Sequence, residues 1–194
     1  MKSKFLAIMV LTLLLVFTLA GCQSTADDAS VTQPIETTEV NSVSSSEDST
    51  TEALEPYIME DFKLTALDGT ETSLYAYEGK MIVVNFWATW CKYCIQEMPL
   101  LDELNKRDDV VVLAISVGED EKTVKDYIDK YGYEFDVFLD EEGTLASKFG
   151  VTGFPTSLFL GKDFEYFYSF PGMLEENTIE GIFNAIDEVL QNRQ

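Results

Sequence analysis

The sequence predicts an α/β domain in which a central β-sheet carries helices on both faces. Two apolar runs rich in β-branched residues, 81–88 (MIVVNFWA) and 110–117 (VVVLAISV), have the composition of buried strands. The segment 119–132 begins with acidic residues and ends with a lysine and a glycine, which is the pattern of a helix. Strand and helix signals alternate in this way through residues 57–194, and such alternation is typical of an α/β sheet.

The domain is expected to open with a β-hairpin. Two short strand-like runs, 62–67 and 71–77, flank the dipeptide Asp68-Gly69, which is favoured in hairpin turns. The strand at 81–88 follows, and then a helix over 93–107 whose apolar side chains recur every three or four residues. The end of the central strand therefore meets the start of this helix in a short loop.

The second half of the domain continues the alternation. After the strand at 110–117, the elements expected are a helix at 119–132, a strand at 135–140, a short helix at 144–149, strands at 156–161 and 165–170, and an amphipathic helix at 174–191.

The composition excludes several classes of protein. The chain of 194 residues contains no histidine, which rules out Ser-His-Asp and Cys-His nucleophiles, Cys2His2 zinc sites and histidine-ligated haem. Its 13 Lys and Arg residues against 35 Asp and Glu residues give a net charge of −22, which would repel a nucleic acid. We expect no metal site and no cofactor. The three cysteines are the residues left for special chemistry.

Residues 1–21 are predicted to be a lipoprotein signal peptide. Two lysines precede an apolar run over 5–20, which is short for a membrane-spanning helix and suits a signal-peptide core. The run ends in LAGC, Leu19–Cys22, which resembles the bacterial lipobox, where the cysteine is lipidated and becomes the new N-terminus. This resemblance implies a lipid anchor at Cys22 and a domain on the extracytoplasmic face of the cell membrane. An uncleaved anchor with an incidental cysteine is the alternative.

Residues 22–56 are expected to comprise the lipidated cysteine and a disordered tether. After Cys22 this segment is rich in Ser, Thr and acidic residues, and it contains no basic and no aromatic residue. Such a composition cannot bury enough apolar surface to offset the entropy of ordering. The globular domain is therefore assigned to residues 57–194.

Cys91 and Cys94 stand three residues apart at the start of a predicted helix, and three roles are open to them. A structural zinc site needs four ligands, and the chain offers neither a second CxxC nor a histidine. A structural disulfide across so short a loop stabilises the fold by only about 2 kcal/mol. A redox-active pair fits better, because one helical turn brings the two cysteines within disulfide range and a helix N-terminus favours the thiolate.

The helix start also assigns different roles to the two cysteines. Cys91 would lie at the positive end of the helix dipole and face solvent, so we expect it to be the nucleophile. Cys94, one turn deeper, would be shielded and act as the resolving thiol.

The segment 83–99, VVNFWATWCKYCIQEMP, resembles the active-site segment of thioredoxin-like proteins. Within these it is most similar to the TlpA/ResA-like family of membrane-anchored, extracytoplasmic thiol-disulfide oxidoreductases, and the likeness covers about 57–192. The resemblance implies a thioredoxin fold, a mixed sheet flanked by helices, with an N-terminal β-hairpin and a central strand–helix insertion at about 111–140.

A second stretch, 150–160 (GVTGFPTSLFL), carries the same resemblance. Phe154, Pro155 and Thr156 match the cis-proline loop of the family, which lies opposite the CxxC pair. The resemblance implies that this loop binds an extended substrate segment, with Trp90 as a surface residue beside the disulfide. The alternatives are an ordinary strand-start proline at Pro155 and a core tryptophan at Trp90.

The resemblance also points to Glu97. Thioredoxins commonly carry a buried aspartate where this chain has Asn85, which cannot take up a proton. TlpA/ResA-like proteins have a glutamate at the position of Glu97, three residues after Cys94, and it is thought to serve the second cysteine instead. A catalytic role for Glu97 is therefore expected, and a solvated helix glutamate is the alternative.

By resemblance, the chain is an enzyme that reduces disulfides of exported proteins and is recharged by a membrane electron donor. Apocytochrome c and a methionine sulfoxide reductase are candidate substrates. Two alternatives stay open: a disulfide-forming oxidant and a non-catalytic binding lipoprotein on a thioredoxin scaffold. Peroxiredoxins share the fold, but their PxxxTxxC pattern is missing because Val84 and Ala88 stand in place of its proline and threonine.

Overall fold

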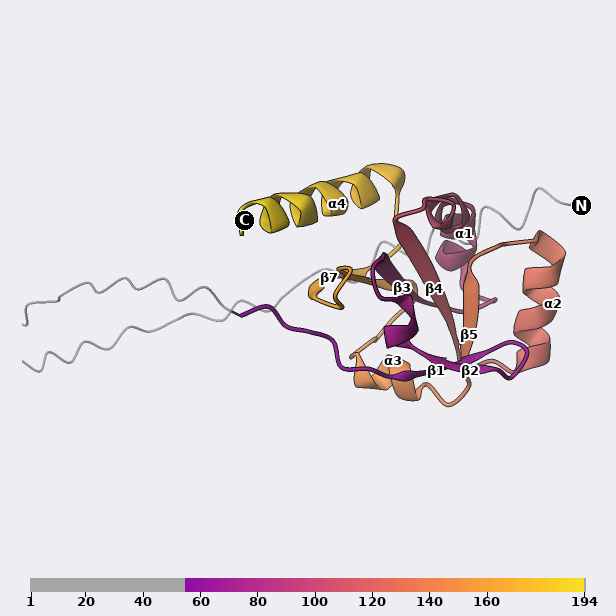
Figure 1. The fold of residues 1–194 in the computed structure, drawn as a ribbon. Coiled ribbons are helices and arrows are strands. Elements are labelled where there is room, and N and C mark those ends of the chain that lie inside the picture. Colours follow the sequence, from indigo (N-terminus) through magenta and orange to yellow (C-terminus); the bar gives the residue numbers. More distant parts are fainter. Residues whose placement is uncertain (1–54, 194) are drawn as a thin grey trace, which may run out of the picture. The chain divides into compact units, whose positions relative to one another are not determined.

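Figure 1 shows the protein in a computed structural model that describes residues 55–193. The predicted signal peptide, the predicted lipidation site Cys22 and nearly all of the predicted tether lie outside the described residues. Along the chain the elements are β1 (Lys63–Ala66), β2 (Glu71–Ser73), the 3-10 helix η1 (Leu74–Tyr77), β3 (Met81–Trp87), α1 (Lys92–Asn105), β4 (Val110–Val117), α2 (Glu121–Tyr131), β5 (Asp136–Asp140), α3 (Thr144–Lys148), β6 (Thr156–Leu160), β7 (Tyr166–Pro171) and α4 (Glu176–Gln191).

The strands form one mixed sheet of seven strands in the order β2-β1-β5-β4-β3-β6-β7. β3 pairs in parallel with β4, and β4 pairs in parallel with β5. β6 runs antiparallel to both β3 and β7, and β1 runs antiparallel to both β2 and β5. The chain thus enters α1 from a strand that has neighbours on both sides, and the start of α1 has a fixed position.

Each face of the sheet carries its own hydrophobic core. Along β3, Val83 and Trp87 belong to the core that contains both cysteines, called here the cysteine-side core, whereas Val84 and Phe86 belong to the opposite core. α1, α2 and α4 contribute to the cysteine-side core, and α3 and η1 contribute to the opposite one. In Figure 1, α1 and α4 lie above the sheet and α3 lies below it. The predicted arrangement, with helices on both faces, is confirmed.

Most predicted elements occur within two residues of their predicted ends. The strand at 110–117 is β4 as predicted, and α2 ends at the predicted glycine. Gly132 adopts a left-handed conformation with φ of 71°, and its N–H donates to the carbonyl oxygen of Ile128. This conformation suits glycine, which has no Cβ to clash with the preceding turn.

The predicted strand over 71–77 is wrong in its second half. β2 ends at Ser73, and a 3-10 helix follows. The strand-like run after Asp68-Gly69 predicted a strand, but the chain turns inward so that Leu74 is fully buried in the core opposite the cysteines. Side-chain bonds hold this turn, because the Asp61 carboxylate accepts from the N–H of Tyr75 and the Tyr75 hydroxyl donates to the carbonyl oxygen of Met59.

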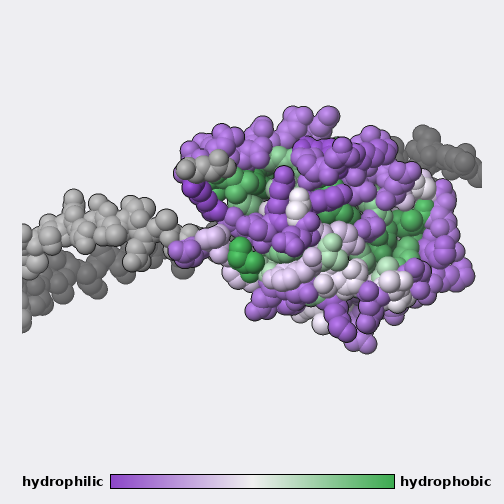
Figure 2. All heavy atoms as spheres, in the orientation of Figure 1, coloured by the Kyte–Doolittle hydropathy of each residue, from purple (hydrophilic) through white to green (hydrophobic). Residues whose placement is uncertain are grey.

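The visible surface of the domain is mainly hydrophilic, as expected from the composition (Figure 2). Hydrophobic side chains show chiefly in hollows, one of which lies beneath α4. Among the helices of residues 55–193, none has both the length and the apolar character needed to cross a lipid bilayer.

Packing of α1 against the sheet is expected to supply much of the stability of the site. Leu101 lies on the buried face of α1 and has no exposed surface. We predict that Leu101→Ala lowers the free energy of unfolding by about 2–5 kcal/mol, because it leaves a cavity in the cysteine-side core. Urea unfolding measures the change.

The matched control is Glu103→Ala on the exposed face of the same helix. Among residues 55–193, the ion pair of Glu103 is with Lys106 at the surface, with 2.7 Å between the charged atoms. Its replacement is expected to change stability by less than about 0.5 kcal/mol. Equal effects of the two substitutions would contradict the packing described for α1.

Candidate active site: the Cys91–Cys94 pair

Cys91 and Cys94 form a disulfide bond in the structure, with Cα atoms 5.3 Å apart. This separation lies in the usual range for disulfides, about 4.4–6.8 Å. The predicted pairing of the two cysteines is confirmed, and one helical turn accommodates it.

The N-terminus of α1 surrounds the first sulfur. Cys91 is the N-cap residue, and its Sγ accepts a hydrogen bond from the N–H of Cys94 at 3.2 Å. The first N–H groups of a helix have no partner within the helix and carry a partial positive charge, so they favour an anion at this place. In the reduced protein the same position would stabilise a thiolate on Cys91.

The two cysteines differ in exposure, although by less than the sequence predicted. Cys91 keeps 6% of its surface exposed, and Cys94 keeps none. The expectation that Cys91 faces solvent is therefore corrected: it lies at the edge of the core, and only a small part of it meets solvent. The reason is that both cysteines pack into the cysteine-side core together with the fully buried Trp87. The order of exposure still makes Cys91 the sulfur that a substrate can reach.

The loop before β6 lies beside the disulfide. The bond between Phe154 and Pro155 is cis, as the resemblance implied. The rings of Trp90 and Phe154 meet edge to face with centroids 6.0 Å apart, and Trp90 is 69% exposed. Trp90 is thus a surface residue, and the alternative of a core tryptophan is wrong.

Two hydrogen bonds hold the cis-proline loop in place. The carbonyl oxygen of Pro155 accepts from the N–H of Gly172, and the Thr156 hydroxyl donates to the carbonyl oxygen of Gly153, each at 2.8 Å. Thr156 also pairs with Phe86 of β3 in the sheet. The structure therefore brings all four predicted substrate-binding residues to one end of the sheet. Their contact with a substrate remains a prediction.

Glu97 is buried, with 1% of its surface exposed, so the alternative of a solvated helix glutamate is wrong. Its Oε1 accepts from Asn85 Nδ2 at 2.8 Å, and its Oε2 accepts from the N–H of Leu174 at 2.7 Å. Burial raises the pKa of Glu97 to about 7, although these two hydrogen bonds act to lower it. A carboxyl group of this pKa can take up and release a proton near neutral pH.

Sequence reasoning missed a second buried carboxylate, Glu119, two residues after β4. It accepts from the N–H of Thr89 at 2.7 Å, from the Thr89 hydroxyl and from the Ser116 hydroxyl at 3.0 Å. Because Thr89 lies two residues before Cys91, Glu119 fixes the loop that leads into the disulfide. An acidic residue just beyond the carboxyl end of a central strand was the signal that could have found it.

Sequence reasoning also set Asn85 aside as inactive. The structure places Asn85 on β3 with no exposed surface, in direct contact with Glu97. Its second partner is Ser157 of β6. No pattern of the sequence indicates this contact, because it joins elements that are far apart along the chain.

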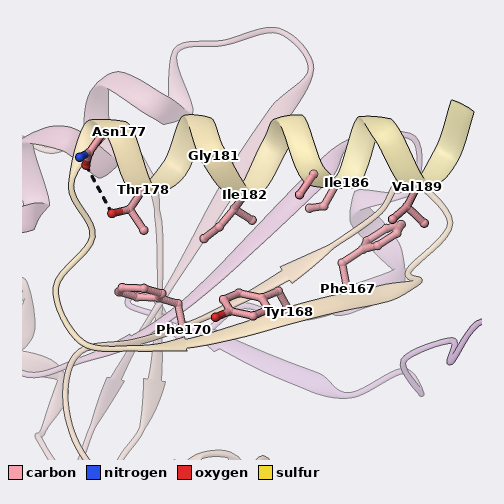
Figure 3. A pocket seen from close by; sticks show the side chains of 10 residues that line it. Phe167, Tyr168, Phe170, Asn177, Thr178, Gly181, Ile182, Ile186 and Val189 are labelled. Atoms are coloured by element: carbon pink, nitrogen blue, oxygen red, sulfur yellow. Dashed lines mark hydrogen bonds between the residues drawn. The ribbon is translucent and has the colours of Figure 1, made fainter.

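An apolar pocket of about 380 Å³ lies elsewhere, between α4 and β7. Figure 3 shows aromatic side chains of β7 facing aliphatic side chains of α4 across it. The labelled residues of the two walls include Phe167, Phe170, Ile182 and Ile186. None of the lining residues belongs to the predicted site, so this pocket is not part of the dithiol centre.

The mixed sheet, the disulfide at the start of α1 and the cis-proline loop beside it define a thioredoxin-fold protein with a dithiol centre. The family model described as "AhpC/TSA family" matches residues 57–164, and the chain belongs to this family. Peroxiredoxins share this fold, but the chain lacks their sequence pattern. Val84 and Ala88 stand at the positions of the peroxiredoxin proline and threonine.

Similar proteins are named as thiol-disulfide oxidoreductases or as thioredoxin-like proteins. The chain is 35% identical over 129 residues to the thiol-disulfide oxidoreductase ResA of Geobacillus kaustophilus, covering 65% of this chain and 74% of the relative. It is 39% identical over 105 residues to the thioredoxin-like protein YneN of Bacillus subtilis, covering 52% and 61% of the two chains. The chain is thus a thiol-disulfide oxidoreductase, and the alternative of a non-catalytic scaffold is set aside.

A solved structure supports the fold. The exposed lipoprotein thioredoxin Etrx1 of Streptococcus pneumoniae superposes with a TM-score of 0.58 at 30% identity, covering 64% of this chain and 99% of that chain.

The raised pKa of Glu97 predicts a specific pH dependence of stability. The native carboxyl group holds its proton up to about pH 7, whereas in the unfolded chain it ionises near its ordinary value of 4.5. The native state therefore binds more protons between these values, and its stability falls as pH rises through this window. At about 1.4 kcal/mol per pKa unit, the loss is up to roughly 3 kcal/mol.

Glu97→Gln should remove this loss, because glutamine does not titrate. The measurement is urea unfolding of the oxidised protein at pH 5 and pH 8, with exposed Glu103→Gln as the matched control that keeps the wild-type difference. An undiminished pH difference in Glu97→Gln would show that Glu97 is not the buried acid described here.

Proposed function

We propose that this chain reduces disulfide bonds of exported proteins outside the cytoplasmic membrane. The observation that carries the reductive direction is the buried carboxylate of Glu97, one turn along α1 from Cys94. A buried negative charge near a thiol disfavours the thiolate. Dithiols become strong oxidants when their reduced form is stabilised. The N-terminus of α1 favours a thiolate on Cys91, but the negative charge of Glu97 acts against a thiolate on Cys94, and this opposing effect favours a reductant.

The proposed reaction begins at Cys91. In the reduced protein the Cys91 thiolate attacks one sulfur of the substrate disulfide, and the other substrate sulfur leaves as a thiolate that takes up a proton. Cys94 then loses its proton to Glu97, and its thiolate attacks Sγ of Cys91. The mixed disulfide breaks, the second substrate thiolate leaves, and Cys91 and Cys94 are left as the disulfide. Two electrons have passed from the enzyme to the substrate.

The substrate would bind at the surface beside the disulfide. Trp90 and the backbone around Pro155 would hold an extended substrate segment, in the manner of a strand added to a sheet. Phe154 and Thr156 flank this backbone, and the bonds of the loop to Gly172 and Gly153 keep it in place.

Lipidation of Cys22 would anchor the domain on the outer face of the cell membrane. The signal-peptide pattern of residues 1–21 supports this proposal, and so does the description of the pneumococcal relative as an exposed lipoprotein. A membrane-embedded electron donor would return the Cys91–Cys94 disulfide to the dithiol. Apocytochrome c and a methionine sulfoxide reductase are the proposed substrates.

The enzyme is expected to catalyse the reduction of insulin by dithiothreitol. Cys91→Ala should abolish this activity because it removes the attacking sulfur. Cys94→Ala should instead accumulate a mixed disulfide with the substrate, visible on a non-reducing gel. Accumulation by Cys91→Ala in place of Cys94→Ala would reverse the roles of the two cysteines.

The reduction potential tests the direction. A reductant is expected near or below about −270 mV, the value of thioredoxin, when the protein is equilibrated with redox buffers. A value near about −120 mV, that of a disulfide-forming oxidant, would overturn the reductive proposal.

Cys22→Ala tests the anchor in living cells. The variant should lose acylation and signal-peptidase processing, because the modified sulfur is absent. A matched Ser24→Ala variant should be processed like the wild type. Unchanged processing of Cys22→Ala would remove the lipoprotein part of the proposal.

A further inference from the structure

Asn85 lies at the centre of an unusual set of hydrogen bonds. Its Nδ2 donates to Glu97 Oε1 at 2.8 Å and to the Ser157 hydroxyl oxygen at 2.9 Å. Its Oδ1 is buried and has no hydrogen-bond partner within residues 55–193. An unpaired buried acceptor costs about 1–3 kcal/mol, so an idle asparagine at this place would be a poor choice for stability.

The arrangement suits Glu97 in only one of its two protonation states. The carboxylate receives one donor at each oxygen, from Asn85 and from the N–H of Leu174. A protonated Glu97 carries an O–H group that needs an acceptor. The backbone N–H of Leu174 can only donate, so the proton must lie on Oε1, where the Asn85 amide now presents a second donor.

We propose that Asn85 is a positioning residue whose side-chain amide turns over when Glu97 takes up a proton. A half-turn about the Cβ–Cγ bond exchanges Nδ2 and Oδ1. The Glu97 O–H group then donates to Oδ1, and the Ser157 hydroxyl changes from accepting to donating. The proton travels with Glu97, and no bond to Asn85 is formed or broken.

An amide suits position 85 because this side chain must donate to the carboxylate of Glu97 and accept from its acid form. A half-turn exchanges the nitrogen and the oxygen of the amide, so its heavy atoms keep the same positions. An aspartate at position 85 could accept from the acid but would repel the carboxylate of Glu97. A leucine could serve neither state. Of these three side chains, the amide is the one that both donates to the base and accepts from the acid.

Among the described residues, the groups that hydrogen-bond to Glu97 are uncharged. They are the Asn85 amide from β3 and the N–H of Leu174 ahead of α4, with Ser157 of β6 behind the amide. Cys94 is buried one turn earlier on the same helix. None of the ion pairs among residues 55–193 includes Glu97. Neutral hydrogen-bonding groups therefore contact Glu97 when it takes up or releases its proton.

The turn can be tested in the oxidised full-length protein without any catalysis. The Asn85 side-chain amide signals in 1H-15N NMR should shift with a midpoint near pH 7, the pKa of Glu97. In Glu97→Gln the glutamine oxygen must accept from Leu174, which points its NH2 group at Asn85. The amide should then hold the turned orientation, and its signals should stay at their acid-form positions at every pH.

Signals of Asn85 that ignore the titration of Glu97, or that still titrate in Glu97→Gln, would overturn the proposal. Because this test uses the oxidised protein, it can fail while the proposed disulfide-reducing function stands, and the reverse also holds.

A kinetic test measures the effect of Asn85 on the rate of each attack, and it rests on the proposed function. Asn85→Leu should slow the attack of Cys94 on the mixed disulfide by about tenfold, the rate equivalent of one hydrogen bond. The first attack, by Cys91, should keep its rate. Stopped-flow measurement with a fluorescent disulfide substrate separates the two steps.

The matched control is Asn105→Leu, which also removes a structural asparagine of the same domain. Asn105 accepts from the N–H of Val112 at the far end of α1, away from the disulfide. Asn105→Leu should lower the stability of the domain without slowing the attack of Cys94 more than the attack of Cys91. If Asn85→Leu slows both steps equally, as a general loss of structure would, the positioning role is refuted. If Asn85→Leu does not fold, the NMR titration of the wild type decides.

Discussion

The burial of Glu97 is the constraint on which the arrangement of the site depends. A carboxylate without water needs hydrogen-bond donors, and the lack of them costs several kcal/mol. α1 cannot supply them from its own backbone, so the donors come from Asn85 of β3 and from Leu174 ahead of α4. The same carboxylate therefore fixes the helix that carries both cysteines against the central strand and the C-terminal part of the fold.

Two buried carboxylates, Glu97 and Glu119, lie near the disulfide. Their hydrogen-bond donors differ, and this difference gives them different roles. Glu119 receives a backbone N–H and two hydroxyl groups, and these partners tie it to the loop before Cys91. Glu97 receives two donors, and the amide that supplies one of them has an oxygen without a partner among residues 55–193. Glu119 is thus a fixed support, whereas the proposed turn of Asn85 would give a proton on Glu97 an acceptor.

The local features of this chain could be predicted from its sequence, and the long-range ones could not. Apolar runs predicted β3 and β4, and the helix start at Cys91 followed from spacing. The 3-10 helix after β2 was missed because burial of Leu74 overrode the strand prediction for 71–77. The contact between Asn85 and Glu97 was missed because it depends on how α1 packs on the sheet, and the small exposure of Cys91 was missed for the same reason.

The small exposure of Cys91 also restricts what can react with it. With 6% of Cys91 exposed, we propose that its sulfur meets a substrate disulfide on a segment that reaches down beside Trp90 and the cis-proline loop. The groups that would receive this segment are an exposed aromatic ring and backbone atoms, which do not select charge or sequence strongly. Discrimination then depends on the substrate: a flexible chain can adopt the extended form, whereas a disulfide held inside a folded domain cannot. We therefore propose that the substrates are disulfides in unfolded or loosely folded proteins.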